Sequence, residues 1–474
     1  MVRLLFALGL VAHIGALKTR IDKESCSPLK NMQSYSALTV GIGTPQQKFQ
    51  LVADTGSSAV IVTHCSCQEA NCYGYSTPCF SGTNRSSTFS VPLDSGGEPA
   101  AVAMEFGSGV IYGVIGTDKV TVGQTSALMN QSVIFMYDHQ LDAGIYDFEG
   151  IFGLGLPYQH RGSEEGRSWL TTAAVESFSM CFSSLQEDGT LRLNTAAQST
   201  LLGNVGEYHW GLDFHGISLG DSSAEALFCG DSETRSGMRS PCAVIPDSGT
   251  TLMLGPSDQI RTLYASLCDQ WPRCRKAYAE FNRTQQDQSI GKAVGDWLKH
   301  VLDKWGLPSI ETPLTPDPAT QIKLDKRRQF ESLLADCSSW AKGPAMLDEE
   351  LPTLFWQVAG KEGKTQALRV PASAYVVAAA GPTGETMCLP FFGSYDYVTQ
   401  SNGPVWILGT AIFYEYVVHY DLSTTPAGIS FASTSCGSCD SSSEASVGLL
   451  RRRTQFRRQE SKVRMPHINR DLPL

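Results

Sequence analysis

Short apolar runs that end in glycine or hydroxyl residues recur along the chain and predict β-strands joined by tight turns. Residues 37–45 alternate between apolar and small or polar side chains and then reach a proline, as a strand entering a turn does. Two further runs, residues 49–53 and 243–246, are mostly apolar, which is typical of buried strands. Each of these two runs leads directly into an aspartate. The pattern therefore predicts a β-rich chain that presents two acids at strand ends.

A different period marks the region from about residue 257 to residue 350. Three segments there carry apolar side chains on one face at helical spacing: residues 257–281, 290–305 and 329–340. Both Asp-containing runs lie outside this region. We expect it to be a helical insertion on the surface of the second half of the chain.

Length and composition favour a secreted, two-lobed β protein. At 474 residues the chain exceeds one ordinary core, and 42% apolar residues with 44 glycines and 23 prolines suit a turn-rich fold. Residues 1–17 join an early arginine to an apolar run and predict a secretory signal peptide. A short signal-anchor is the alternative. No later apolar run is long enough to span a bilayer.

The cysteines predict disulfides. Fourteen of them follow the signal sequence, and the secretory pathway is oxidising. Three N-x-S/T triplets fit a glycoprotein in that setting: Asn84, Asn130 and Asn282. Four cysteines cluster near the first Asp run, where zinc is the competing interpretation: Cys65, Cys67, Cys72 and Cys79. Since no group of histidines accompanies them, we expect bridges, and three connectivities remain open.

Charge is distributed unevenly. The whole chain carries −10, whereas residues 449–474 hold eight Lys/Arg and two Asp/Glu, so that this part is +6 and the rest −16. An acidic body argues against nucleic acid as a partner. We expect residues 440–474 to form a flexible basic tail, with processing at its paired arginines or an electrostatic role as alternatives.

Two matched loops carry the candidate chemistry. Asp54-Thr55-Gly56-Ser57 and Asp247-Ser248-Gly249-Thr250 each join an acid to a hydroxyl residue, a glycine and a second hydroxyl residue. One such sequence alone is ordinary turn chemistry. Two copies, 193 positions apart, indicate two related lobes, each of which presents one carboxylate to a shared cleft.

These loops and several later motifs resemble those of pepsin-type aspartic proteases, over about residues 28–432. Each half also carries the family's later apolar strand with glycine, at residues 150–154 and 406–409, and residues 106–118 are similar to the flap hairpin. The resemblance implies a mainly β, bilobal fold with two six-stranded-barrel-type lobes, a central cleft and the helical insertion. The cysteine-rich loop after the first Asp resembles the nepenthesin and plasmepsin branches.

The resemblance also implies an activity, which is endopeptidase cleavage of extended polypeptides at acidic pH. Asp54 and Asp247 would activate a water between them, without cofactor, metal or covalent intermediate. Ser57 and Thr250 would hydrogen-bond the outer oxygens of the two acids, and Thr55 and Ser248 would tie the loops together. Gly56 and Gly249 would let backbone amides approach the carboxylates. A catalytically silent binding protein on the same fold is the alternative.

The flap departs from the family pattern. Phe106 stands where relatives carry a tyrosine, and Ile61 stands where they carry the tryptophan that receives its hydroxyl. Both halves of one hydrogen bond are therefore replaced together, which leaves no buried partner unpaired. We expect ring packing and the backbone of Gly107, Ser108 and Gly109 to hold the substrate.

Domain limits and disulfides follow from the same resemblance. It implies a short leader or vestigial prosegment at residues 18–27, an N-terminal lobe at 28–202 and a C-terminal lobe at 203–439. A membrane-active saposin-like insertion would need more bridges than residues 257–350 can form. The expected pairs are Cys229–Cys242, Cys337–Cys388, Cys268–Cys274 and Cys181–Cys436, with Cys26 and Cys439 unassigned. We expect a monomer, either secreted or in an acidic lysosome-like or vacuole-like organelle.

Overall fold

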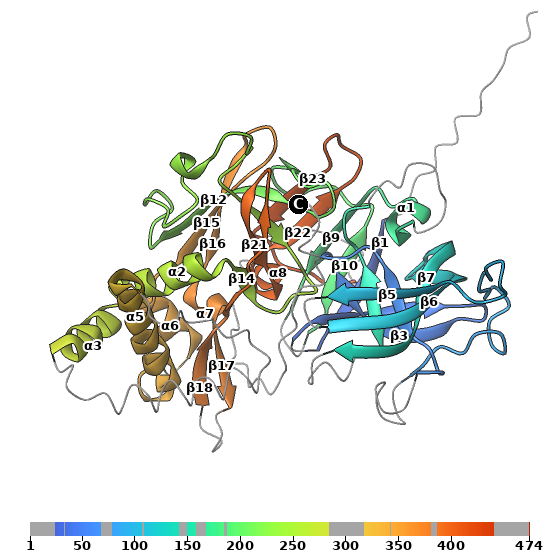
Figure 1. Ribbon diagram of the computed structural model, residues 1–474, viewed down its shortest axis with the longest axis horizontal. Coiled ribbons are helices and arrows are strands. Elements are labelled where there is room, and N and C mark those ends of the chain that lie inside the picture. The colour runs from blue at the N-terminus through green and yellow to red at the C-terminus, as the bar shows by residue number, and fades with distance from the viewer. Residues whose placement is uncertain are drawn as a thin grey trace, which may run out of the picture.

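Three β-sheets of 13, 8 and 2 strands dominate the computed structural model. The structure describes residues 24–32, 34–67, 78–106, 109–141, 149–157, 167–183, 187–283, 317–341, 343–380, 386–439 and 474. The mainly β prediction is confirmed. In Figure 1 the N-terminal strands lie on one side and the last strands lie in the middle. On the other side lie the helices α2 (Ser257–Gln270), α3 (Pro272–Arg283), α5 (Pro318–Ala335) and α6 (Pro344–Glu350).

Each half of the chain repeats one strand arrangement around its Asp-bearing strand. In both, that strand pairs in parallel with a later Gly-containing strand, which pairs antiparallel with a third strand, which in turn pairs in parallel with a fourth. The first set is β3 (Gln47–Asp54), β8 (Gly150–Gly153), β4 (Val60–Thr63) and β7 (Thr125–Leu141). The second is β13 (Cys242–Pro246), β21 (Gly403–Leu408), β14 (Met253–Gly255) and β19 (Phe392–Ser394).

Further strands extend each set at its edges. In the first half β2 (Ser36–Ile42) pairs with β3, and in the second half β12 (Leu212–Leu219) pairs with β13. The other strands of the second half are β15 (Leu354–Ala359), β16 (Thr365–Val370), β17 (Val376–Ala380), β18 (Thr386–Pro390) and β20 (Val398–Thr399).

The hairpin that resembles a flap is formed by three strands. Strand β5 (Ala101–Phe106) pairs with β6 (Gly109–Val122), with Phe106 opposite Gly109. On its other edge β6 pairs with β7 as far as the Gly109–Leu141 position. Since β7 follows β6 to this end, the hairpin is braced along its whole length (Figure 1).

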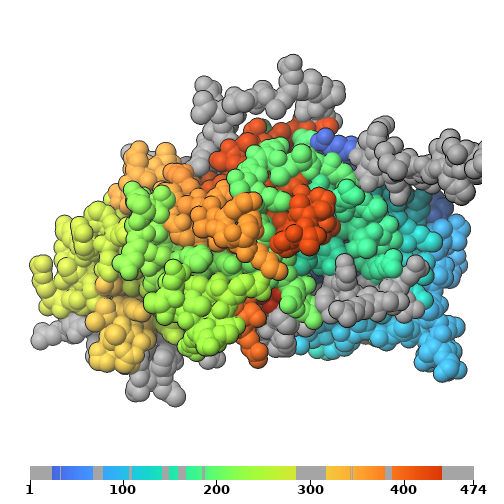
Figure 2. Space-filling view, turned by 90° about the horizontal axis from the view of Figure 1, so that it is seen from above, coloured from blue at the N-terminus to red at the C-terminus, as the bar shows by residue number. Residues whose placement is uncertain are grey.

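A continuous run of strands joins the two halves through the 13-stranded sheet. It consists of β11 (Leu202–Gly203), β23 (Gly428–Ala432), β22 (Val417–Asp421), β9 (Ser177–Cys181), β10 (Gly189–Leu193) and β1 (Ser25–Asn31). We call these six strands the interlobe sheet. In Figure 2, mid-chain and late segments lie between the N-terminal strands and the helices, where strands of the interlobe sheet join the two halves.

The start of β1 differs from the expected lobe boundary. The strand begins at Ser25 rather than at Pro28, and Cys26 is bonded to Cys439. Residues 25–27 pair with β10, so they belong to the folded body. The resemblance placed them in a short leader or vestigial prosegment, because residues 28–31 resemble the family's mature N-terminus.

Six disulfides lie among the described residues. Four are the pairs that the resemblance implied: Cys181–Cys436, Cys229–Cys242, Cys268–Cys274 and Cys337–Cys388. The other two are Cys26–Cys439 and Cys65–Cys79. Cys67 is also disulfide-bonded, and Cys72 lies outside the described residues. This framework fits folding in an oxidising compartment.

The helices begin and end at other residues than the sequence pattern predicts. Residues 257–281 are not one helix, because the chain breaks at Trp271 and starts again at Pro272, whose fixed φ and missing N–H suit a first helical position. The third segment starts earlier than expected and ends at Ala335, and the predicted helix 290–305 lies outside the described residues. The longer helices are α2 (Ser257–Gln270), α3 (Pro272–Arg283), α5 (Pro318–Ala335) and α6 (Pro344–Glu350).

Shorter helical segments complete the regular structure. They are α1 (Trp169–Thr172), α7 (Ala372–Tyr375), α8 (Thr410–Glu415), η1 (Asp231–Glu233) and η2 (Cys337–Ser339). Within the described ranges, no helix is both long and apolar enough to cross a bilayer.

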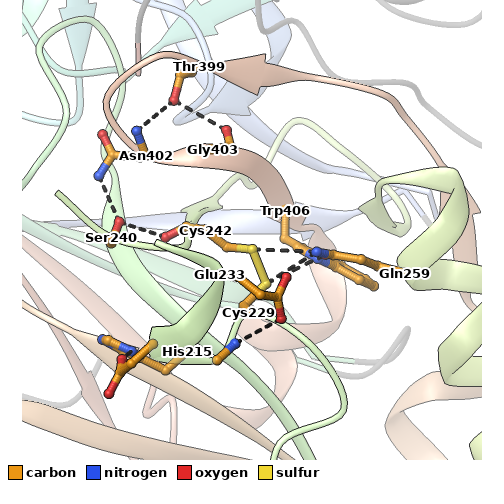
Figure 3. The surroundings of a disulfide bond; sticks show 12 residues. His215, Cys229, Glu233, Ser240, Cys242, Gln259, Thr399, Asn402, Gly403 and Trp406 are labelled. Atoms are coloured by element: carbon orange, nitrogen blue, oxygen red, sulfur yellow. Dashed lines mark hydrogen bonds and ion pairs between the residues drawn. A yellow bond between two sulfur atoms is a disulfide. The ribbon is translucent and has the colours of Figure 1, made fainter. Parts of the chain in front are cut away.

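Helix α2 is part of the lobe core, which corrects the expectation that the whole of residues 257–350 is a surface insertion. Its apolar face is buried at Ile260, Leu263 and Leu267. Gln259 accepts a hydrogen bond from the Trp406 indole at 2.6 Å and lies against the Cys229–Cys242 disulfide (Figure 3). Its amphipathic period is that of any helix packed on a sheet, so the period alone did not distinguish core from insertion.

Candidate active site

The two aspartates stand at equivalent strand ends. Strand β3 ends at Asp54, and β13 ends one residue before Asp247. The parallel pairing continues past both, because the Leu154 amide donates to the Asp54 carbonyl at 2.6 Å and the Asp247 amide donates to the Leu408 carbonyl at 2.9 Å. Both side chains are fully buried. The repeated strand arrangement therefore delivers both carboxyl groups to the interior.

Each carboxyl group has the same pair of local donors. The Gly56 amide donates to Asp54 Oδ1 at 2.9 Å, and the Ser57 hydroxyl donates to Oδ2 at 2.6 Å. The Gly249 amide donates to Asp247 Oδ1 at 2.9 Å, and the Thr250 hydroxyl donates to Oδ2. These four donors hold both acids in fixed orientations.

The two acids contact one another across the halves. Their side chains share a hydrogen bond, and a Cβ built on Gly56 would lie 2.8 Å from the Asp247 carboxyl carbon. Gly56 therefore leaves the space that the second carboxyl occupies. Burial, and next the charge of Asp54, raise the pKa of Asp247 above its usual value. Such a pair retains a proton at a pH where isolated carboxyls have lost theirs.

The second residue of each loop reaches the opposite loop. Thr55 Oγ1 donates to the Pro246 carbonyl and accepts from the Ser248 amide, both at 3.0 Å. Ser248 Oγ donates to the Ala53 carbonyl at 2.8 Å and accepts from the Thr55 amide at 3.0 Å. These four bonds are related by a twofold exchange of the loops. They fix the distance between the two acids.

Comparison with known proteins decides the family. Residues 34–434 match the family model described as eukaryotic aspartyl protease. The chain belongs to the eukaryotic aspartyl protease family. Its activity is that of an aspartic endopeptidase, and polypeptides are its class of substrate. The finer likeness to nepenthesins and plasmepsins stays a prediction.

Two of the relatives of the protease match most of its length, and a third matches about half of it. Gastricsin of Cavia porcellus is 24% identical over 418 residues, which cover 85% of this chain and 82% of the relative. An aspartic proteinase of Oryza sativa subsp. japonica is 23% identical over 458 residues, covering 87% and 88%. Phytepsin of Hordeum vulgare is 27% identical over 263 residues, covering 51% and 47%.

A tyrosine of the interlobe sheet adds to the grip between the loops of this aspartyl protease. The Tyr420 hydroxyl donates to the Pro246 carbonyl at 3.1 Å and lies 3.5 Å from Thr55 Oγ1. Its ring is fully buried and stacks on Phe178 at 4.7 Å between centroids. The sequence offered no sign of this contact, because Tyr420 lies 174 positions from Pro246 and 365 from Thr55.

The flap residues are only partly described. Ile61 is fully buried in an apolar cluster with Ile111, Ile134 and Ile151. Gly109 starts β6 with a φ of 128°, a conformation that favours glycine. The Phe106 side chain and residues 107–108 lie outside what the structure describes, so the compensated Phe106/Ile61 pair stays a prediction. Among the described residues, no group of three or more His, Cys, Asp or Glu could hold a metal.

Proposed function

We propose that Asp54 and Asp247 share one proton and together activate a water molecule for peptide hydrolysis. One observation carries the proposal: two fully buried carboxyl groups contact each other, and each is oriented by its own amide and hydroxyl donors. Two carboxylates so close cannot both ionise cheaply, as in aspartic proteases generally. The pair therefore supplies a base and an acid at the same pH.

The proton inventory of the reaction follows from this sharing. The ionised carboxyl takes a proton from the water molecule while the water oxygen attacks the peptide carbonyl carbon. The protonated carboxyl donates toward the developing oxyanion, and a proton later passes to the leaving amine. The acids titrate as a pair, so neither is assigned the resting proton. No protein nucleophile becomes covalently attached.

Activity at acidic pH follows from the same arrangement. As the pH rises, the pair loses its shared proton and with it the general acid. The raised pKa of Asp247 extends the protonated range upward, so activity persists above the pH at which an isolated carboxyl would already be ionised. The activity then falls as the pH rises further.

We propose further that the protease is a monomer of the secretory pathway, secreted or held in an acidic lysosome-like or vacuole-like organelle. The six disulfides of the described residues and the signal-like residues 1–17 support this location. An acidic organelle would also supply the pH at which the shared proton is held. All three N-x-S/T asparagines are exposed, which fits glycosylation there.

Replacing each acid by asparagine tests the proposal. A generic unfolded protein is incubated at pH 4 with the wild type, Asp54→Asn or Asp247→Asn, and the products are read by mass spectrometry. Since acid–base groups contribute about 10²–10⁴-fold, we expect each variant to lose at least about a hundredfold in rate while circular dichroism stays unchanged.

The matched control is Asp188→Asn, at an exposed acid before β10. It should cleave at the wild-type rate. If a folded Asp54 or Asp247 variant keeps most of its activity, or if the wild type is inactive at acidic pH, the assignment of the two acids is wrong.

A further inference from the structure

Leu474 occupies a pocket in the second lobe, far along the chain from the last described strand. Its side chain is 3% exposed and belongs to the main apolar core. Its carbonyl oxygen accepts two backbone hydrogen bonds, from the Glu207 amide at 2.5 Å and from the Tyr208 amide at 3.2 Å. One short loop thus contacts both the side chain and the carbonyl group of Leu474. We call it the 206–211 loop.

Two glycines shape the pocket that receives Leu474. A Cβ built on Gly211 would lie 2.9 to 3.2 Å from the Cγ, Cδ2 and Cδ1 atoms of Leu474, and one on Gly206 would lie 3.2 Å from its carbonyl carbon. A larger residue at Gly211 would occupy space that the leucine fills, whereas a Cβ at Gly206 would first meet the His209 carbonyl oxygen at 2.1 Å. The pocket therefore fits a branched apolar side chain and the backbone carbonyl of the same residue.

The 206–211 loop is held in shape by contacts that do not involve Leu474. The Asn204 side chain donates to the Gly206 carbonyl at 2.7 Å and accepts from the Gly211 amide at 2.8 Å. The Val205 amide donates to the Gly211 carbonyl at 2.9 Å. These bonds close the two ends of the loop on each other without any contribution from Leu474.

The pocket lies behind the catalytic loops. Trp210, within the same loop, is fully buried, packs on Tyr420 at 4.9 Å between centroids, and donates from its indole to the Leu154 carbonyl at 3.0 Å. Strand β11, just before this loop, pairs with β23, which pairs with β22. In the view of Figure 1 the mark of the C-terminal end overlaps these strands.

We infer that the 206–211 loop is a binding site for a leucine presented with its carbonyl, and that its occupant is Leu474 of the same chain. The site holds Leu474 against the protein body at a point other than the Cys26–Cys439 bridge. Two amides for one oxygen and a pocket shaped by glycines give it selectivity for a branched apolar residue. The inference is independent of the catalytic proposal.

Binding of a peptide from outside tests the site. A fluorescent peptide with the sequence of residues 465–474 is titrated against Leu474→Asp, in which the protein's own occupant is removed, and against the wild type. We expect the peptide to bind the variant at least about tenfold more tightly, because a tethered ligand competes at a high effective concentration. The same peptide ending in aspartate should not bind.

Amide hydrogen exchange provides a second measurement, which needs no peptide. In the wild type, the amides of Glu207 and Tyr208 should exchange at least about tenfold more slowly than in Leu474→Asp, while Leu474→Ile, which keeps a branched apolar side chain, should retain the protection. Equal exchange in all three proteins, or equal peptide binding by the wild type and Leu474→Asp, would overturn the inference.

Discussion

The two Asp loops share their hydrogen bonds but not their surroundings. Within each loop a glycine amide and a hydroxyl hold the acid, and each loop reaches across to the other. Around them the burial differs, since Ser57 is half-buried whereas Thr250 is fully buried. The repeated sequence thus gives both loops the same hydrogen bonds. The residues that surround the two loops differ, and so does the burial of the loops.

Among the hydrogen bonds that join the two Asp loops, those made by Ser248 should be the most costly to remove. Ser248→Ala leaves the Thr55 amide and the Ala53 carbonyl without their buried partner, at about 1–3 kcal/mol each. Thr55→Val should cost less, because the Pro246 carbonyl keeps the Tyr420 hydroxyl. Urea unfolding and kcat of both variants measure the difference.

A buried serine outside the loops serves as the control for that comparison. Ser240 donates to the Cys242 carbonyl at 2.9 Å and accepts from Asn402 at 2.9 Å. Ser240→Ala should lower stability but leave kcat unchanged. If Thr55→Val destabilises the protein more than Ser248→Ala, Tyr420 does not compensate as described.

The pair of buried carboxyl groups should affect how the stability of the protein depends on pH. The folded pKa of Asp247 is raised, so its favourable contribution is complete below the unfolded value of about 3.9 and is lost as pH rises toward the folded value. Asp247→Asn removes this loss. We expect its Tm to fall less than that of the wild type between pH 4 and pH 7, by roughly 2–4 °C per kcal/mol relieved.

A second buried acid separates burial from the neighbouring charge. Burial also raises the pKa of Asp213, but its neighbours Ser240, Arg239, His215 and Asn402 lower that pKa, whereas Asp247 faces another carboxylate that raises it. Asp213→Asn should therefore also reduce the fall in Tm between pH 4 and pH 7, but by less than Asp247→Asn does. If Tm falls less with pH in Asp213→Asn than in Asp247→Asn, the role given to Asp54 is wrong.

We expect the smallest effect from the Tyr420 hydroxyl, which donates to the Pro246 carbonyl. Tyr420→Phe keeps the ring on Phe178 but removes the hydroxyl from the Pro246 carbonyl, a hydrogen bond worth about 0.5–1.5 kcal/mol. If Tyr420 positions the loops, kcat should fall up to about tenfold with KM unchanged.

Tyr416→Phe is the matched control, because the Tyr416 hydroxyl accepts from the Arg369 amide at 2.7 Å and donates to the Arg369 carbonyl at 3.2 Å. It should cost similar stability at constant kcat. A double-mutant cycle of Tyr420→Phe with Thr55→Val should show coupling. Additive effects would mean that the tyrosine hydroxyl acts on stability alone.

Local patterns allowed the chemistry to be predicted, since the acid, its hydroxyl and its glycine lie within four residues in each loop. The family and the mainly β fold followed from the order of such motifs. Element limits were less accessible: the break at Trp271 and Pro272 and the burial of α2 depend on a sheet from elsewhere in the chain. Tyr420 and the Leu474 pocket join residues far apart in sequence, where no local period exists.

The bridge between Cys26 and Cys439 spans 413 positions, so the protein body is a closed covalent ring rather than a string. One cut anywhere between these cysteines opens the ring but releases nothing, because both new ends remain on a single molecule. A protease that is exposed to proteolysis, including its own, can thus be nicked once without losing a piece, and both Asp loops stay on the same covalent molecule.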